Sequence, residues 1–335
     1  MTNRRKNELK QELRKSERRG DLSKDELRFV LDNPAEIEYS FDELLEAFIE
    51  DCEFRNLREH TIKFYRSELT TFKNILHEQG LDTSPYEITN EIIKHNVIMY
   101  MKNKGIKAVS INSRLRAIRA FFNFLESHNY IKINPMKNIK LLKDRKRIVE
   151  TFDMKQIKAL LNACDIRTFV GFRDRTIMLF LLETGVRVNE LIGIKVTDII
   201  WSQKIVRIRN TKGGYERFVP VQNKMIDQLK KYVTIRGQVD TDYLFITQDN
   251  TPMSKRQVQN RIKHYGEMAK IKNVRCSPHT FRHTFAKLSV MNGANAFQLQ
   301  AILGHSTMEV TKMYVNLFSN EIQEGHAKFS PLKNL

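Results

Sequence analysis

The sequence SPHTFRHTFA, residues 277–286, places two histidines and an arginine at the start of a predicted helix. Ser277 is a favourable N-cap, and Pro278 suits the first helical position, where its missing N–H needs no partner. At about 100° per residue, one face of this helix carries three basic side chains beside Ala286, namely His279, Arg282 and His283. The opposite face carries an apolar stripe of Phe281, Phe285 and Leu288. The pattern predicts that the basic face is not the core face.

The basic face has three explanations: a metal ion, an anion, or surface charge without a ligand. His279 and His283 are spaced like zinc ligands, but no third ligand follows at a suitable spacing and Arg282 would repel a dication. An anion fits better, because a helix start offers unpaired backbone N–H groups and the positive end of a dipole. Arg282 adds a planar fork that can hold two phosphate oxygens. Taken alone, the segment leaves both an anion site and an ordinary surface arginine open.

The composition favours a polyanionic partner. The chain has 335 residues, 41% of them hydrophobic, which is enough for at least two domains with apolar cores. Its formal charge of +18 favours nucleic acid over a membrane. No apolar run approaches the roughly 20 residues that span a bilayer, and the start lacks the apolar region of a signal peptide, so we expect a cytoplasmic protein with no membrane partner. The three cysteines are odd in number and scattered, which supports neither a disulfide framework nor a cysteine zinc site.

The order of the elements predicts a mainly α protein with a small β-sheet. Residues 1–38 are polar and charged, which predicts a helical or partly disordered arm. Four helical patterns within residues 39–130 predict a compact all-helical domain. Residues 131–150 are expected to form a linker near a phosphate backbone, and the basic run in this linker is Arg145, Lys146 and Arg147.

A second, mixed α/β domain is expected over residues 151–318, followed by a tail of residues 319–335. Two short β-rich runs, KIVRIRN and YERFVPV, surround TKGG and predict a small hairpin. The run TDYLFIT, residues 241–247, is expected to add an edge strand. The TKGGYE segment lacks the spacing of a nucleotide-binding glycine loop, and the carboxylates are not clustered as in a two-metal nuclease. We therefore expect no cofactor, neither ATP nor a metal ion.

Several motifs together resemble the tyrosine recombinase, or phage integrase, family. The segment HTFRHTFA followed by LGHSTMEVTKMY is similar to the C-terminal signature of that family, with His305 and Tyr314 at similar spacings after Arg282. LLETGVRVNELIGIK resembles the first arginine box, and NTKGGYERFVPV resembles the hairpin that presents the lysine of the family. The likeness is strong from residue 151 to about residue 316, and over residues 41–128 it is one of general character. It implies a helical core-binding domain, a SAM-like bundle, in front of a tyrosine-recombinase catalytic domain.

The resemblance implies six catalytic residues, which are Arg187, Lys212, His279, Arg282, His305 and Tyr314. Tyr314 would attack the phosphate, and because a phenol has a pKa near 10 it needs help in losing its proton and needs cations around the phosphorane. Arg187 and Arg282 would neutralise the two non-bridging oxygens.

The other catalytic residues would handle protons and hydrogen bonds. His279 would accept a proton or a hydrogen bond, and His305 would donate to the phosphate. Lys212 would protonate the departing 5′ oxygen, and Glu190 would support the site by orienting it. His283 has no such role, and its substitution is expected to cost much less activity than that of His279 or Arg282.

Two helices are expected to contact DNA, because arginine and asparagine side chains read base edges in the major groove. In the helix of residues 108–127 the face opposite the core stripe carries Asn112, Arg116, Arg119 and Asn123. In the helix that begins near residue 254 the outward face carries Arg256, Asn260 and Lys263. The alternative for both faces is a solvated basic surface. The resemblance implies that two domains clamp double-stranded DNA at core recombination sites.

The expected function is site-specific recombination of DNA through a 3′-phosphotyrosyl intermediate and a Holliday junction, for a mobile element such as a phage or transposon. The tail is expected to dock onto a neighbouring protomer in a homo-tetramer on two DNA sites, with an accessory directionality factor as a further partner. Three alternatives stay open: a catalytically inactive architectural protein, a recombinase that resolves chromosome or plasmid dimers, and a type IB topoisomerase or telomere resolvase.

Overall fold

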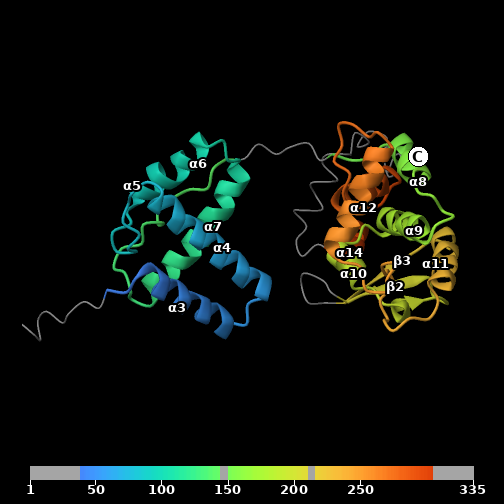
Figure 1. Ribbon diagram of the computed structural model, residues 1–335, viewed down its shortest axis with the longest axis horizontal. Helices are drawn as coiled ribbons and strands as arrows, with labels where there is room; N and C mark the ends of the chain where they lie inside the picture. Colours follow the sequence, from blue (N-terminus) through green and yellow to red (C-terminus); the bar gives the residue numbers. More distant parts are fainter. Residues whose placement is uncertain (1–37, 144–149, 210–215, 305–335) are drawn as a thin grey trace, which may run out of the picture. The chain divides into compact units, whose positions relative to one another are not determined.

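The computed structural model describes residues 38–143, 150–209 and 216–304, and it divides between Lys146 and Arg147 into two compact units (Figure 1). We call residues 38–143 the N-terminal unit and residues 150–304 the C-terminal unit. Several predicted features lie outside the described residues: the arm, the basic run Arg145, Lys146 and Arg147, the tail, and the site residues Lys212, His305 and Tyr314.

The N-terminal unit is all helical, as its sequence predicts. Its elements are α3 (Phe41–Phe54), α4 (Glu59–His77), α5 (Asn90–Ile92), the π-helical η1 (Ile93–Met99), α6 (Tyr100–Asn103) and α7 (Ala108–Ser127). The four helical patterns are thus confirmed, with a π-helical segment inside the third. The core holds a group of packed aromatic rings, which includes Phe41, Phe48, Phe72 and Phe121.

The first part of the predicted linker belongs to this unit instead. Ile131, Met136 and Ile139 are buried in its core. Asn112 on α7 makes two hydrogen bonds with the main chain of Leu142. Its Nδ2 donates to the Leu142 carbonyl at 2.9 Å, and its Oδ1 accepts from the Leu142 N–H at 2.8 Å. Residues 131–142 are therefore packed against α7 and are not a linker.

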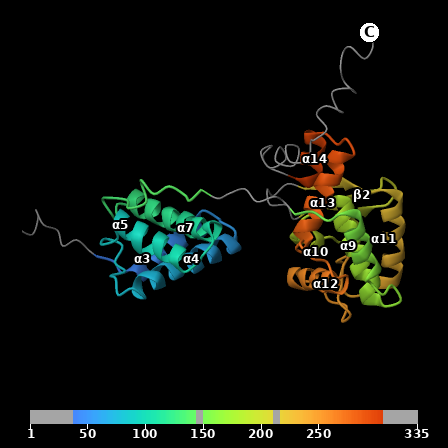
Figure 2. The ribbon, with the colours of Figure 1, turned by 90° about the horizontal axis from the view of Figure 1, so that it is seen from above.

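The C-terminal unit is mixed, with helices around a small sheet. Its elements are α8 (Met154–Asn162), α9 (Phe169–Thr184), α10 (Val188–Ile192), the 3-10 helix η2 (Val196–Asp198), β1 (Ile199–Ile200), β2 (Ile205–Ile208), β3 (Arg217–Pro220), α11 (Asn223–Arg236), α12 (Lys255–Met268), α13 (Pro278–Met291) and α14 (Ala296–Leu303). Helix α9 lies inside the unit and packs against both α11 and α13 (Figure 2). The mainly α fold with a small sheet is confirmed.

The sheet has the antiparallel order β1-β2-β3. The pairs Arg207 with Phe218 and Ile208 with Arg217 confirm the predicted hairpin. The edge strand predicted at residues 241–247 is wrong, because this segment makes only isolated bridges at Tyr243 and Ile246. Its apolar residues are buried in the core, so they reflect packing and not sheet pairing.

A buried ion cluster lies in the C-terminal unit at Asp174. One carboxylate oxygen accepts from Arg173 Nε at 2.9 Å and from Arg173 Nη2 at 2.7 Å. The other accepts from Arg261 Nε at 2.6 Å and from the Tyr265 hydroxyl at 3.1 Å. The cluster thereby fastens α12 to α9. No helix in the described part of the chain is long and apolar enough to cross a membrane.

Candidate active site

Helix α13 begins as its sequence predicts, but its buried face differs. Ser277 Oγ accepts from the Thr280 N–H at 3.3 Å, and Pro278 takes the first position. The prediction that the basic face avoids the core is wrong for Arg282, which is only 3% exposed, whereas Phe285 is only partly buried. The reason is that main-chain carbonyls from two other segments reach this arginine.

Arg282 is held by the main chain of α9 and α14. Its Nη1 donates to the Gly185 carbonyl at 2.7 Å, and its Nη2 donates to the Leu303 carbonyl at 2.9 Å. Gly185 ends α9 in the left-handed conformation, with φ of 60°. A Cβ at this position would lie 2.4 Å from the Phe285 ring and 2.8 Å from the Leu303 side chain, so only glycine allows this close approach.

Arg187 meets the same end of α14 from another side. It is the N-cap residue of α10, and its backbone N–H donates to Glu190 Oε2 at 2.8 Å. Its Nη1 donates to Glu190 Oε1 at 3.0 Å and reaches the Leu303 carbonyl at 3.4 Å. Its Nη2 reaches the Gly304 carbonyl at 3.3 Å. Arg187 and Arg282, 95 positions apart by residue number, therefore share one carbonyl acceptor.

Glu190 is enclosed by two arginines, of which the sequence predicted only one. Arg217 on β3 donates from Nη1 to Oε1 at 2.9 Å and from Nη2 to Oε2 at 2.8 Å. Burial pushes the pKa of Glu190 up, but the hydrogen bonds and charges of Arg217 and Arg187 outweigh this, so the pKa lies below its ordinary value. The contact could not be found from sequence, since the only local indication of Arg217 is that it stands in the predicted hairpin.

Three consecutive carbonyls at the end of α14 accept from three arginines. The Ile302 carbonyl accepts from Arg217 Nε at 2.9 Å, while those of residues 303 and 304 serve Arg282 and Arg187. The last carbonyls of a helix have no partner within it and carry the negative end of its dipole, so cations stabilise them. The cluster therefore fixes the C-terminal end of α14, the last helix that the structure describes.

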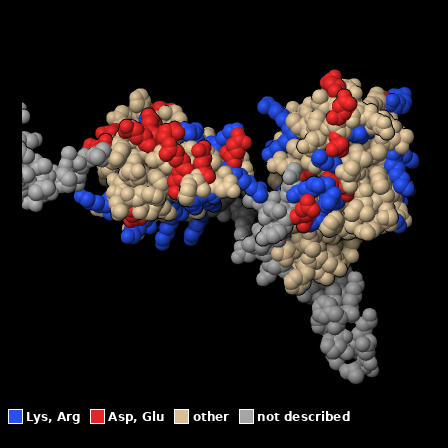
Figure 3. Space-filling view, turned by 90° about the horizontal axis from the view of Figure 1, so that it is seen from below, with Lys and Arg blue, Asp and Glu red and all other residues tan. Residues whose placement is uncertain are grey.

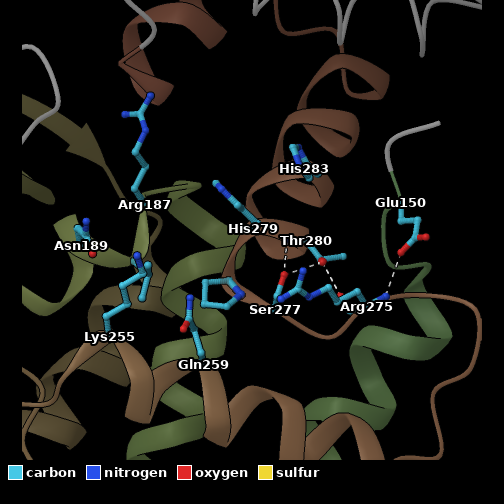
Figure 4. A pocket seen from close by; sticks show the side chains of 12 residues that line it. Glu150, Arg187, Asn189, Lys255, Gln259, Arg275, Ser277, His279, Thr280 and His283 are labelled. Atoms are coloured by element: carbon cyan, nitrogen blue, oxygen red, sulfur yellow. Dashed lines mark hydrogen bonds between the residues drawn. The ribbon is translucent and has the colours of Figure 1, made fainter. Parts of the chain in front are cut away.

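An open pocket of about 530 Å³ lies beside this cluster. Its lining comes from α10, α12, α13 and the segment before α13, with Arg187, Lys255, Gln259, Arg275 and His279 among the residues that form it (Figure 4). The acidic residue in the lining, Glu150, accepts from the Arg275 N–H at 3.0 Å. The start of α13 and three basic side chains thus favour an anion in the pocket.

His279 and His283 both line the pocket, with their rings stacked at 5.8 Å and 23°. Partial burial of the ring, followed by the charges of Arg282 and Arg187, lowers the pKa of His279. Burial, followed by the neighbouring His279 and Arg282, lowers the pKa of His283 to about 4. Both rings are therefore neutral near pH 7, which is the form that accepts a proton.

The hairpin that leads to residues 210–215 is anchored at its base. Asp198, which is buried, accepts from Arg207 Nε at 3.2 Å and from Arg209 Nε at 2.6 Å. It also accepts from the Lys195 N–H at 2.9 Å. This anchor fixes the strand from which the segment containing Lys212 departs.

The residues predicted to contact DNA divide between the two helices. On α12, Arg256, Asn260 and Lys263 are exposed, as predicted. Of the four side chains predicted on α7, Arg116 and Asn123 are exposed, and the prediction is wrong for Asn112, which is buried and makes two hydrogen bonds to Leu142.

Arg119 and Asn123 on α7 are engaged with the segment after that helix. Arg119 donates to the Ile139 carbonyl, and Asn123 accepts from Asn134 at 2.9 Å. This face of α7 is therefore partly covered by residues 131–142 and partly exposed to solvent.

Elsewhere on the N-terminal unit, lysine and arginine side chains project from one edge while acidic ones gather on another part of the surface (Figure 3). Across the residues that the structure describes, no group of three histidine, cysteine or acidic side chains could hold a metal ion.

Comparisons with known proteins cover both units. Residues 150–321 match the phage integrase family, and residues 45–129 match the phage integrase N-terminal SAM-like domain. A tyrosine recombinase XerD of Staphylococcus haemolyticus is 30% identical over 282 residues, which are 83% of this chain and 94% of that protein. A tyrosine recombinase XerD of Shewanella oneidensis is 29% identical over 302 residues, 88% of this chain and 98% of that protein.

Solved structures share the fold at lower identity. A lambda integrase dimer bound to a COC′ core site has a TM-score of 0.72 at 17% identity, and the match covers 95% of this chain and 89% of that chain. The XerH site-specific recombinase bound to a palindromic difH substrate has a TM-score of 0.69 at 19% identity, covering 86% and 84%. The chain belongs to the phage integrase family, and it is a tyrosine recombinase, an enzyme that acts on DNA.

Proposed function

We propose that the chain is a site-specific recombinase that cleaves and rejoins DNA through a 3′-phosphotyrosyl intermediate and a Holliday junction. The observation that carries this proposal is the meeting of Arg187 and Arg282 on the Leu303 carbonyl, beside the start of α13. Arg187 lines the pocket beside the start of α13 and can bind a non-bridging oxygen of a phosphate. Arg282 does not line the pocket; it is 3% exposed and holds the main chain at Gly185 and Leu303, so in this proposal it adds its charge from behind Arg187. Such preorganised charge lowers the barrier most where negative charge develops in the transition state.

In the proposed reaction the phenolic oxygen of Tyr314 attacks phosphorus, and the bond to the 5′ oxygen breaks. Neutral His279 accepts the phenol proton, and Lys212 gives a proton to the departing oxygen, so a phosphotyrosine and a 5′ hydroxyl are formed. His305 donates to the phosphate. Because the phosphotyrosine conserves the energy of the bond, a 5′ hydroxyl from a second DNA end reverses the step without ATP or a metal ion.

A duplex with a nick beside the scissile phosphate tests this chemistry, because the short 5′ fragment diffuses away and leaves the protein covalently attached. We expect trapping on denaturing gels with the native protein, in the presence of a metal chelator, and none with Tyr314→Phe. Absence of trapping with the native protein, or undiminished trapping with Tyr314→Phe, contradicts the assignment.

We further propose that both units grip the duplex and that four protomers assemble on two core sites. The exposed side chains of α12 and Arg116 of α7 support the first point. The tail after residue 318 carries spaced apolar residues that suit docking on a neighbouring protomer. Deletion from Ser319 onward is expected to abolish recombination more than binding to a single site, and equal loss of both would contradict this role.

Two outcomes of recombination are proposed for a cytoplasmic enzyme of this kind. The first is integration or excision of a phage or transposon, with an accessory directionality factor. The second is resolution of chromosome or plasmid dimers, which the curated relatives named tyrosine recombinase XerD favour. A supercoiled circle with two directly repeated sites tests resolution, and two separate circles test integration. Products from only one substrate decide between the two outcomes.

A further inference from the structure

Arg217 has no place in the reaction outlined above, yet all three of its guanidinium nitrogens donate hydrogen bonds within the cluster. Both of its terminal nitrogens bind the Glu190 carboxylate, and its Nε binds the Ile302 carbonyl. Its side chain is 11% exposed, that of Glu190 is 1% exposed and that of Arg187 is 26% exposed. Among the described residues, Arg187 lines the pocket whereas Arg217 does not.

The charges around Glu190 raise a specific problem for phosphate binding. A buried carboxylate that contacts a single arginine would neutralise it, and Glu190 contacts Arg187 through the side chain at 3.0 Å. Arg187 would then be oriented but would offer little net charge to a phosphate. With two arginines on the one carboxylate, the group as a whole keeps one positive charge.

We propose that Arg217 is a positioning residue for the recombination reaction: its charge balances that of Glu190, so that Glu190 orients Arg187 without cancelling the charge that Arg187 offers to a phosphate. The inference rests on the proposed function, in which Arg187 binds the scissile phosphate. In this proposal Arg217 does not contact a phosphate in the pocket; it acts through Glu190 and through the end of α14.

The geometry assigns the two arginines different tasks. Arg217 uses the fork-to-fork arrangement, with contacts of 2.9 and 2.8 Å, which is the strongest arginine–carboxylate geometry. The side chain of Arg187 makes one contact with the carboxylate and only long ones, of 3.3 and 3.4 Å, with α14. The shorter, saturated pair is therefore Arg217 with Glu190, and the guanidinium with weaker partners is the one that faces the pocket.

The first test measures single-turnover trapping on the nicked duplex. Arg217→Met is expected to slow trapping by about 10- to 100-fold, less than the two to three orders of magnitude for losing a phosphate donor outright. Arg217→Lys keeps the charge and should lie between native and Met. Arg217→Met combined with Glu190→Gln should recover most of the rate, because the uncompensated carboxylate is gone. Additive losses in the double variant would overturn the proposal.

The second test does not depend on cleavage. In a Tyr314→Phe background, affinity is compared for intact duplexes with a phosphate or an uncharged methylphosphonate at the scissile position. The preference for phosphate should fall by at least about threefold in Arg217→Met and return with Glu190→Gln, as expected for a buried charge that cancels its neighbour. An unchanged preference would overturn the proposal even if the enzyme cleaves DNA. A changed preference in a protein that forms no phosphotyrosine would instead contradict the proposed function alone.

A matched control separates these effects from loss of the hairpin. Arg207 lies on the neighbouring strand and pairs with the buried Asp198 at 3.2 Å. Arg207→Met removes a comparable ion pair from the same hairpin and is expected to leave the phosphate preference unchanged. If Arg207→Met and Arg217→Met reduce this preference equally, Arg217 is structural only and the proposal fails.

Discussion

Three buried carboxylates in the C-terminal unit, those of Asp174, Glu190 and Asp198, each bind two arginines, and a comparison of the first two shows different surroundings. Asp174 binds Arg173 and Arg261, and a tyrosine hydroxyl completes the shell. Glu190 binds Arg217 and Arg187. Among the residues described, no member of the Asp174 cluster lines the pocket by α13, whereas Arg187 does.

An arginine in an ion cluster can bind a ligand when protein groups hold its guanidinium only weakly and it faces a pocket. The guanidinium of Arg173 donates to Asp174 and to the Ile246 carbonyl, and both of these partners are buried. Arg187 makes long contacts to α14 and faces an anion-favouring pocket. The first cluster should therefore govern stability and the second catalysis, and the variants below test that division.

The largest effect is expected at the Asp174 cluster. Asp174→Asn leaves the nearly inaccessible Arg173 without its counter-charge, and breaking a buried pair in this way costs about 3–5 kcal/mol of unfolding free energy. Urea denaturation measures this loss. The matched control is Asp242→Asn, whose exposed pair with Lys195 should contribute less than about 1 kcal/mol. A loss of trapping rate without a loss of stability would contradict the division.

Arg187→Gln should show the opposite pattern. Removing one charged donor from a phosphate site slows the chemical step by about two to three orders of magnitude, while its partly exposed side chain makes a smaller contribution to stability. Trapping kinetics at saturating protein and a urea titration measure the two effects. Arg167→Gln, which removes an exposed arginine paired with Asp165, is the control and should change neither. An equal loss of unfolding free energy in Arg187→Gln and Asp174→Asn would contradict the distinction between the two clusters.

Gly185→Ala should perturb the functional cluster through its backbone. The new Cβ would overlap the Phe285 ring, and a left-handed conformation costs a non-glycine residue roughly 1–2 kcal/mol. Thermal denaturation and trapping should both worsen, since the Gly185 carbonyl holds Arg282. Gly80→Ala is the control, because Gly80 also has a positive φ but open space around it. If the two alanine variants lose the same stability and trapping is unaffected, the close approach at Gly185 has no role.

The smallest effect on trapping is expected from His283, whose substitution changes mainly the pH dependence of stability. Its pKa in the folded protein is about 4, below the ordinary value of 6.5, so between these values the unfolded chain binds more protons. Stability should therefore fall as pH decreases from about 6.5 to 4 and level off below that. His283→Gln should flatten this part of the curve while native trapping at neutral pH is largely kept. An unchanged slope would show that the ring is not held neutral.

The sequence predicted the elements better than it predicted which faces they bury. Local rules were sufficient for the cap at Ser277 and for the hairpin, because their partners lie within a few residues. The burial of Arg282 was missed because periodicity counts an arginine as polar, whereas two carbonyls supplied by distant segments satisfy it. Asn112 was missed for the same reason, since its partner is the main chain of residue 142.

Arg217 shows the limit of motif reasoning. The resemblance named Arg187 and Glu190 but gave no reason to single out a strand residue after the hairpin turn. Its importance comes from the fold, which brings β3, α10 and the end of α14 together around one carboxylate. Sequence periodicity does not predict this contact, because it carries no information about which distant segments come together in the fold.

The arginines at the end of α14 have a thermodynamic consequence. Binding free energies are reciprocal, so a ligand that draws Arg187 away from the Gly304 carbonyl must weaken the hold on that carbonyl by the same amount that the hold opposes the ligand. A phosphate in the pocket and the order of the helix end are therefore coupled quantities.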